Sequence, residues 1–124
     1  MQTDEYITRV QRRADLDSTD EASRVTSTVL GIFGTLDLRG QLKDAASQLS
    51  QGIGPMLTAR ETSQSFSASQ FVSAVATELS IDEGAAEKAA TAVLTTLREA
   101  LSDGQFLDVN AVLPEEFHRF VTER

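Results

Sequence analysis

The clearest pattern in the chain is an apolar stripe at helical spacing within residues 19–36. Successive residues of a helix are about 100° apart, so positions three and four apart share a face. The members of the stripe are Ala22, Val25, Val29, Ile32, Phe33 and Leu36. Ser18 and Glu21 precede them as a Ser-x-x-Glu capping box, in which side chains satisfy free backbone N–H groups. The pattern therefore predicts an amphipathic helix that begins at this cap.

The same pattern returns in the second half of the chain with smaller side chains. The corresponding positions are Ala86, Ala89, Val93, Thr96, Leu97 and Ala100. Ser80 and Glu83 give a second Ser-x-x-Glu pattern, which we expect to cap this helix. The punctuation after the stripe also recurs in the same alignment, since Gly40-Gln41 reappears as Gly104-Gln105. Stripe, cap and turn together indicate an internal duplication.

Shorter apolar patterns flank each long helix. Before it, Tyr6, Ile7 and Val10 match Phe71, Val72 and Val75 in spacing. After it, Leu42, Ala45, Ala46 and Leu49 match Phe106, Val109, Val112 and Leu113. We expect Ser67 with Gln70, and Ser102 with Gln105, to cap the second copies. A last short helix follows in each copy, shortened in the first by Gly52, Gly54 and Pro55 and favoured in the second by Pro114.

These elements predict an all-α, roughly orthogonal helical bundle built from two similar half-repeats, with about 6–8 helices. No useful run alternates with period two, so we expect no sheet. The chain is read as a single domain over 1–124, with half-repeats at 3–58 and 68–122 and a polar, Ser-rich connector at 59–67.

Leu30 and Leu94 lie about 80° off the stripe in both copies. A leucine that recurs off the stripe favours a second buried contact, and we expect the two long helices to pack on each other across a pseudo-twofold axis. The alternative is that both are scattered surface residues.

Composition removes several classes of function. The chain has 124 residues and no cysteine, which excludes thiolate catalysis and zinc–thiolate sites. It has no apolar run long enough to span a membrane and no signal-peptide core, so we expect a cytoplasmic location. The net charge of −8 argues against binding to nucleic acid.

The acidic balance includes only two lysines, Lys43 and Lys88. Acidic, lysine-poor chains are common in salt-loving organisms, and an ordinary acidic cytosolic protein is the alternative. Unfolding measured against KCl concentration separates the two, because a halophilic protein gains stability up to molar salt.

The segments "EYITRV" and "SQFVSAV", "AVLTTLREALSDGQ" and "DVNAVLPEEF" resemble the bacterial and archaeal domain of unknown function numbered 2267. The resemblance covers almost the whole chain and implies two helical half-repeats. It implies no activity, cofactor or site residue, because none is established for the family.

Acidic residues and the single histidine offer two further candidates. Glu115-x-x-His118 has the spacing that di-iron bundles use, but such a site needs a second pair, and a solvated helix end is the alternative. Asp108 with Glu115 or Glu116 has the residue types of an acid–base pair. Asp44 recurs as Asp108, which favours a structural role near the start of a helix.

The only basic cluster is Arg9, Arg12 and Arg13, a candidate patch for a protein partner or for self-association. The alternative is that Arg9 pairs with Glu5 at i, i+4. We therefore predict a non-enzymatic interaction or structural module without cofactor or metal. A small-molecule-binding protein is the alternative, with an apolar pocket between the halves where the second stripe is small. The sequence leaves catalysis undecided, since it shows no convergent polar set.

Overall fold

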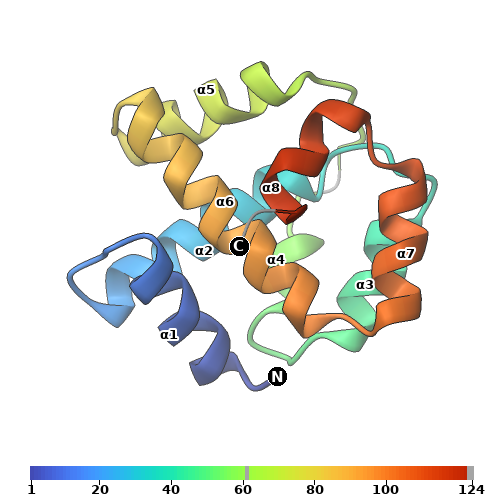
Figure 1. The fold of residues 1–124 in the computed structure, drawn as a ribbon, viewed down its shortest axis with the longest axis horizontal. Helices are drawn as coiled ribbons and strands as arrows, with labels where there is room; N and C mark the ends of the chain where they lie inside the picture. Colours follow the sequence, from blue (N-terminus) through green and yellow to red (C-terminus); the bar gives the residue numbers. More distant parts are fainter. Residues whose placement is uncertain (61, 123–124) are drawn as a thin grey trace.

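The computed structural model describes residues 1–60 and 62–122, which form eight α-helices and one short 3-10 helix (Figure 1). The first half contains α1 (Thr3–Arg13), α2 (Thr19–Phe33), α3 (Gln41–Gln48) and α4 (Gly54–Leu57). The second half contains α5 (Ala68–Leu79), α6 (Glu83–Ala100), α7 (Asp103–Val112), η1 (Glu115–Phe117) and α8 (His118–Thr122). Within these residues there is no strand, only an isolated bridge between Leu36 and Gln64. The predicted all-α fold without a sheet is confirmed.

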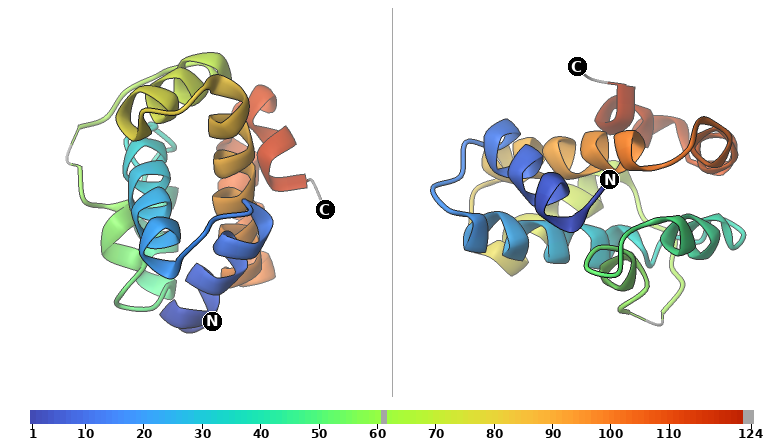
Figure 2. Two further views of the ribbon diagram at one scale, coloured as in Figure 1. Left: turned by 90° about the vertical axis from the view of Figure 1, so that its left-hand side faces the viewer. Right: turned by 90° about the horizontal axis from the view of Figure 1, so that it is seen from below.

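The helices of the two halves follow a similar order. α6, α7 and α8 follow one another in the second half as α2, α3 and α4 do in the first. α1 packs against both α2 and α6, and α5 packs against both α6 and α2. Seen from below in Figure 2, α6 with α8 forms one layer, α2 with α4 forms the other, and α1 lies across their edge. The arrangement is consistent with two half-repeats.

The long helices α2 and α6 contact each other, and their shared core is closely filled. Val29 and Leu30 of α2 are fully buried, and so are Val93 and Leu94 of α6. The burial expected for the two off-stripe leucines is therefore confirmed. Burying a leucine side chain contributes about 1.5–3 kcal/mol, so this contact is a main source of stability.

Three of the four predicted caps are correct. The hydroxyls of Ser18, Ser67 and Ser102 accept hydrogen bonds from the backbone N–H groups three residues on, at 3.0–3.1 Å. The prediction for Ser80 was wrong. Ser80 adopts a left-handed conformation (φ 57°) that ends α5, and Asp82 caps α6 by accepting from the N–H of Ala85 at 2.7 Å. Because Ser80 ends α5 in a left-handed conformation, it does not take the extended conformation of a residue that caps the start of α6.

The first long helix is one turn shorter than its stripe predicted. It ends at Phe33, and Leu36 lies beyond it, buried in the bridge to Gln64. A Cβ atom on Gly34 would lie 1.8 Å from the carbonyl oxygen of Leu57, so only glycine lets α4 approach this closely. Its counterpart Arg98 lies inside α6 and donates to the carbonyl of Val121 at 2.7 Å. The contact between the long helix and the last short helix is therefore a close backbone approach in the first half and a side-chain hydrogen bond in the second.

Candidate functional site

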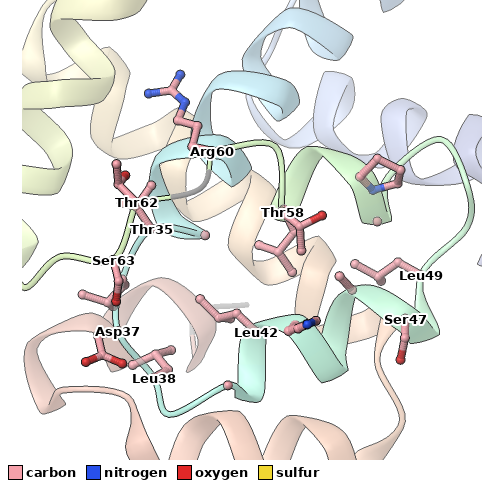
Figure 3. A pocket seen from close by; sticks show the side chains of 18 of the residues that line it. Thr35, Asp37, Leu38, Leu42, Ser47, Leu49, Thr58, Arg60, Thr62 and Ser63 are labelled. Carbon is pink, nitrogen blue, oxygen red and sulfur yellow. The ribbon is translucent and has the colours of Figure 1, made fainter.

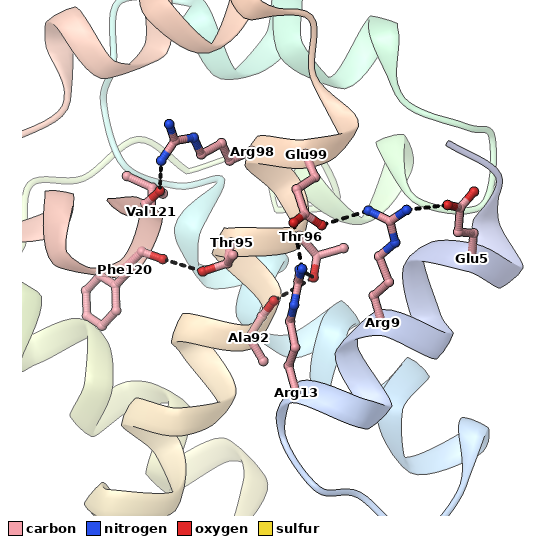
Figure 4. Close-up of polar contacts among 10 residues, drawn as sticks. All are labelled: Glu5, Arg9, Arg13, Ala92, Thr95, Thr96, Arg98, Glu99, Phe120 and Val121. Atoms are coloured by element: carbon pink, nitrogen blue, oxygen red, sulfur yellow. Dashed lines mark hydrogen bonds and ion pairs between the residues drawn. The ribbon is translucent and has the colours of Figure 1, made fainter. Parts of the chain in front are cut away.

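The predicted arginine cluster lies on α1, and two of its members attach that helix to α6 (Figure 4). Arg9 pairs with Glu5 at 2.5 Å, as the i, i+4 spacing predicted, and also with Glu99 at 2.8 Å. Arg13 pairs with Glu99 at 2.6 Å and donates to the Thr96 hydroxyl at 2.8 Å. We call Arg9, Arg13 and Glu99 the Glu99 clamp. Its two guanidinium groups converge on one carboxylate.

The third arginine of the cluster is placed differently. The Arg12 side chain is exposed and makes no hydrogen bond or ion pair within residues 1–60 and 62–122. A role of the cluster in partner binding is not tested by this arrangement. Only Arg12, however, is uncommitted to the fold.

The clamp changes the protonation of the carboxylate at its centre. Hydrogen bonds from Arg13, and then from Arg9, lower the pKa of Glu99 below its ordinary value. Beside it, the hydroxyl of Tyr6 donates to the backbone carbonyl of Val93 at 2.9 Å. Burial raises the pKa of Tyr6 well above its ordinary value, since a buried phenolate would lose its hydration. α1 is therefore held on α6 by the Tyr6–Val93 hydrogen bond inside the core and by the Glu99 clamp at the edge of the core.

A groove of about 440 Å³ runs over the outer face of α6, between α1 and α8. We call it the α6 groove, and it is lined by Arg13, Glu87, Lys88, Thr91, Ala92, Thr95 and Arg119. The wall formed by α8 is anchored by Phe120, which is fully buried, as is Phe117 of the preceding η1. The Thr95 hydroxyl also donates to the carbonyl of Phe120 at 2.9 Å (Figure 4). Two helices from opposite ends of the chain thus frame a third.

Three cations from three helices face this groove. Arg13 comes from α1, Lys88 from α6 and Arg119 from α8. Lys88 forms an exposed ion pair with Asp15, and Arg119 pairs with Glu87 at 2.9 Å. Exposed pairs of this kind contribute about 0–1 kcal/mol each, so an incoming anion can compete for their cations. The sequence pointed to Arg13 alone, because only the fold brings Lys88 and Arg119 beside it.

A second cavity lies elsewhere, in the first half (Figure 3). It has a volume of about 800 Å³ and is bounded by α3, α4 and the segment that follows α4. Its floor consists of leucines that are nearly fully buried: Leu36, Leu38, Leu42 and Leu57. The charged residues at its rim are of mixed sign, namely Asp37, Lys43 and Arg60. We call it the first-half cavity.

This cavity is not the pocket between the halves that the sequence suggested. The small residues of the second stripe do not leave room there, because Ala86 and Ala89 are 0% and 3% exposed within the packed core. Ala86 and Ala89 lie instead inside the core, where small side chains let neighbouring helices approach closely. The open volume arises instead where Gly34 ends α2 early.

The single histidine lies at the start of α8. Nε2 of His118 lies 3.2 Å from the carbonyl oxygen of Leu113. Among the residues that the structure describes, no three His, Asp or Glu side chains are placed to hold a metal ion. Asp44 lies in the first turn of α3 as expected, whereas Asp108 lies in the middle of α7 and Asp103 takes the first turn.

The fold and the groove define a small all-α protein with an internal correspondence between its halves. Residues 3–120 match the model of an uncharacterized conserved protein family, DUF2267. The chain belongs to this family. Comparison with curated proteins gave no match. None of the described helices is long and apolar enough to cross a membrane.

Proposed function

We propose that this protein is a non-enzymatic interaction module that binds a protein partner through the α6 groove. The observation that carries the proposal is the convergence of Arg13, Lys88 and Arg119 on one groove of a chain whose net charge is −8. A local cation cluster on an acidic molecule favours a defined orientation of a charged partner. Thr91, Ala92 and Thr95 at the floor of the groove have small side chains, so the groove has room for another chain.

A groove-filling variant tests this function. Thr91→Phe places a ring in the groove, and Ser27→Phe places the same ring at the corresponding position of α2. Proteins from the native host are captured on wild type and on both variants at native salt. A partner held by wild type and Ser27→Phe but lost by Thr91→Phe supports the proposal. Partners that are held equally by all three proteins contradict it.

The arginine cluster extends this surface along α1. We propose that Arg12 contributes to the partner contact or to self-association, since Arg9 and Arg13 already hold α1 on α6. Replacing all three arginines would loosen the helix, so Arg12→Glu alone is the informative variant. Sedimentation velocity and partner capture should both change in this variant. Unchanged behaviour in both would remove Arg12 from the interface. A cytoplasmic location stays a prediction from the sequence.

A second function is favoured by the size of the first-half cavity. Its volume of about 800 Å³ lies in the range of small-molecule sites, roughly 300–1,000 Å³. We propose that a small molecule bound there would raise the melting temperature of wild type. It should fail to stabilise Ser47→Trp, which fills the rim of the cavity. Ala111→Trp is the matched control, because Ala111 is the exposed counterpart of Ser47 in α7. A compound that stabilises all three proteins equally binds elsewhere.

A further inference from the structure

The first half shows how a chain segment lies across the outer face of a long helix. Arg60, which follows α4, lies against Gly31 of α2, where an added Cβ would come within 3.0 Å of the Arg60 Nε atom. Two nitrogens of Arg60 donate to the two carboxylate oxygens of Glu78, on α5, at 2.7 Å each. A bidentate pair of this kind fixes both direction and register.

The backbone of the same segment is also held. The N–H of Asp37 donates to the carbonyl of Gln64 at 2.9 Å, and the N–H of Gln64 donates to the carbonyl of Thr35 at 2.7 Å. Within the connector, Arg60 is therefore anchored by its charged side chain, and Gln64 by backbone hydrogen bonds. These are the contacts by which extended peptides commonly bind proteins.

The corresponding face of the second half has the opposite charge. Asp15 and Ser80 both have a positive φ, 54° and 57°, and end the first helix of each half. Asp15 lies two residues after Arg13, and Ser80 lies two residues after Glu78. Arg13 at the end of α1 thus corresponds to Glu78 at the end of α5. Thr95 stands where the first half has Gly31, because the alignment that matches Val29 with Val93 also pairs these two positions. Among the described residues, this face is the open α6 groove.

From this inversion we infer that the α6 groove binds an extended acidic segment of a partner protein. One carboxylate of that segment lies among Arg13, Lys88 and Arg119, as the Arg60 guanidinium lies beside Glu78. The inference rests on the proposed function and adds the chemistry of the partner. Glu99 and the Thr96 hydroxyl each occupy one nitrogen of Arg13, so Lys88 and Arg119 supply most of the new contact. Their present pairs with Asp15 and Glu87 are exposed and exchangeable.

The test uses two peptides that differ at one residue, where Glu replaces Arg. The first has the sequence of residues 57–66 with Glu in place of Arg60, and the second keeps Arg60. Each is titrated into the full-length, isotopically labelled protein while backbone amide resonances are followed by NMR. We expect the acidic peptide to shift the resonances of Lys88, Thr91 and Thr95, and the peptide that keeps Arg60 to leave them in place. The shifts should weaken as salt is added, because such pairs are screened.

A matched pair of variants locates the binding. Lys88→Glu should weaken the acidic peptide roughly fivefold or more, since a favourable charge pair becomes a repulsive one. Arg24→Glu makes the same change at the corresponding exposed position of α2 and should have no effect. Circular dichroism checks that both variants keep the helical content of wild type.

The alternative outcomes are distinct. Equal binding of both peptides, or equal weakening by Lys88→Glu and Arg24→Glu, overturns the acidic-segment inference. An acidic peptide that leaves the groove resonances unmoved overturns it too. A single-stranded oligonucleotide that shifts them instead would assign the groove to nucleic acid. In each case the capture experiment with Thr91→Phe and Ser27→Phe still decides the proposed function on its own.

Discussion

The side-chain amide of Gln105, on α7, lies 3.4 Å from the side-chain oxygen of Gln41, on α3. Each of these residues is the counterpart of the other in the two copies, since both follow the glycine of the recurring Gly-Gln pair. Counterparts touch each other only where a twofold axis passes between them. The contact supports our proposal that 1–124 is one domain made of half-repeats 3–58 and 68–122 around such an axis.

The first prediction concerns the two leucines beside that axis. Leu30→Ala and Leu94→Ala should each cost roughly 2–5 kcal/mol of unfolding free energy, because both remove a fully buried side chain. The two costs should be similar. Urea denaturation measures them, and Leu107→Ala serves as the control. Leu107 is 63% exposed, so its loss should change stability by less than about 0.5 kcal/mol. Strongly unequal costs would contradict equivalent environments.

The second prediction sets two glycines against each other. Gly34→Ala should destabilise the protein by about 2 kcal/mol or more, because the new methyl would overlap the Leu57 carbonyl at 1.8 Å. Gly104→Ala should stabilise it by about 0.5 kcal/mol, since nothing lies within 4 Å of the added methyl in α7 and alanine restricts the unfolded chain. Thermal unfolding monitored by circular dichroism gives both signs. If Gly34→Ala left the stability unchanged, α4 could move away from α2 without loss of unfolding free energy.

The third prediction tests the hydrogen bond between Tyr6 and Val93. Tyr6→Phe keeps the ring in the core and removes the hydroxyl that donates to the Val93 carbonyl at 2.9 Å. We expect a loss of about 1 kcal/mol, the usual net value of such a bond. Chemical denaturation measures the loss. If the variant is as stable as wild type, the Tyr6–Val93 hydrogen bond contributes no more than the bond that the hydroxyl makes with water in the unfolded chain.

The fourth prediction concerns alkaline pH. The pKa of Tyr6 is raised in the folded state, so this contribution to stability is present below the unfolded pKa, about 10, and is lost as pH rises through the folded value. Tyr6 is the only tyrosine and there is no tryptophan, so tyrosinate absorbance reports this residue alone. The absorbance should appear together with the loss of helical signal. Ionisation of a fully folded protein near pH 10 would show that Tyr6 is accessible.

The fifth prediction concerns the Glu99 clamp at acid pH. The pKa of Glu99 is lowered in the folded state, so its contribution is present above the unfolded pKa, about 4.3, and is lost as pH falls through the folded value. The difference in unfolding free energy between wild type and Glu99→Gln should therefore shrink between about pH 6 and about pH 3. Because the carboxylate is about a third exposed, the difference should be at most about 1–2 kcal/mol. Glu115→Gln, at an exposed position outside any ion pair of the described residues, should show no such trend.

The sequence predicted the fold well because helical periodicity and caps are local signals. The stripe from Ala22 to Phe33, the cap at Ser18 and the burial of Leu30 and Leu94 all follow from residues within a few turns. The wrong cap at Ser80 shows the limit of a local pattern, because a left-handed residue that ends α5 cannot also begin α6. Backbone direction, which a letter pattern does not contain, decided between Ser80 and Asp82.

The candidate site was less accessible to such reading. Lys88 and Arg119 are unremarkable surface residues in the sequence, and Glu99 has no local signal that joins it to Arg9 and Arg13. Their meeting depends on how α1 and α8 pack against α6. The charge inversion between Arg13 and Glu78 becomes visible only when the first helices are aligned by their ends at Asp15 and Ser80, in a register slightly different from that of the long helices.

The placement of α1 and α5, each against the long helices of both halves, has a consequence for the chain as a physical unit. A polypeptide that ended after α4 would expose to solvent the surface of α1 that packs on α6 and the surface of α2 that packs on α5 and α6. Because the helix order of the two halves is similar, we propose that two such polypeptides would pair as a symmetric homodimer. The link between α4 and α5 turns that bimolecular encounter into a folding step within one molecule, which proceeds at any dilution.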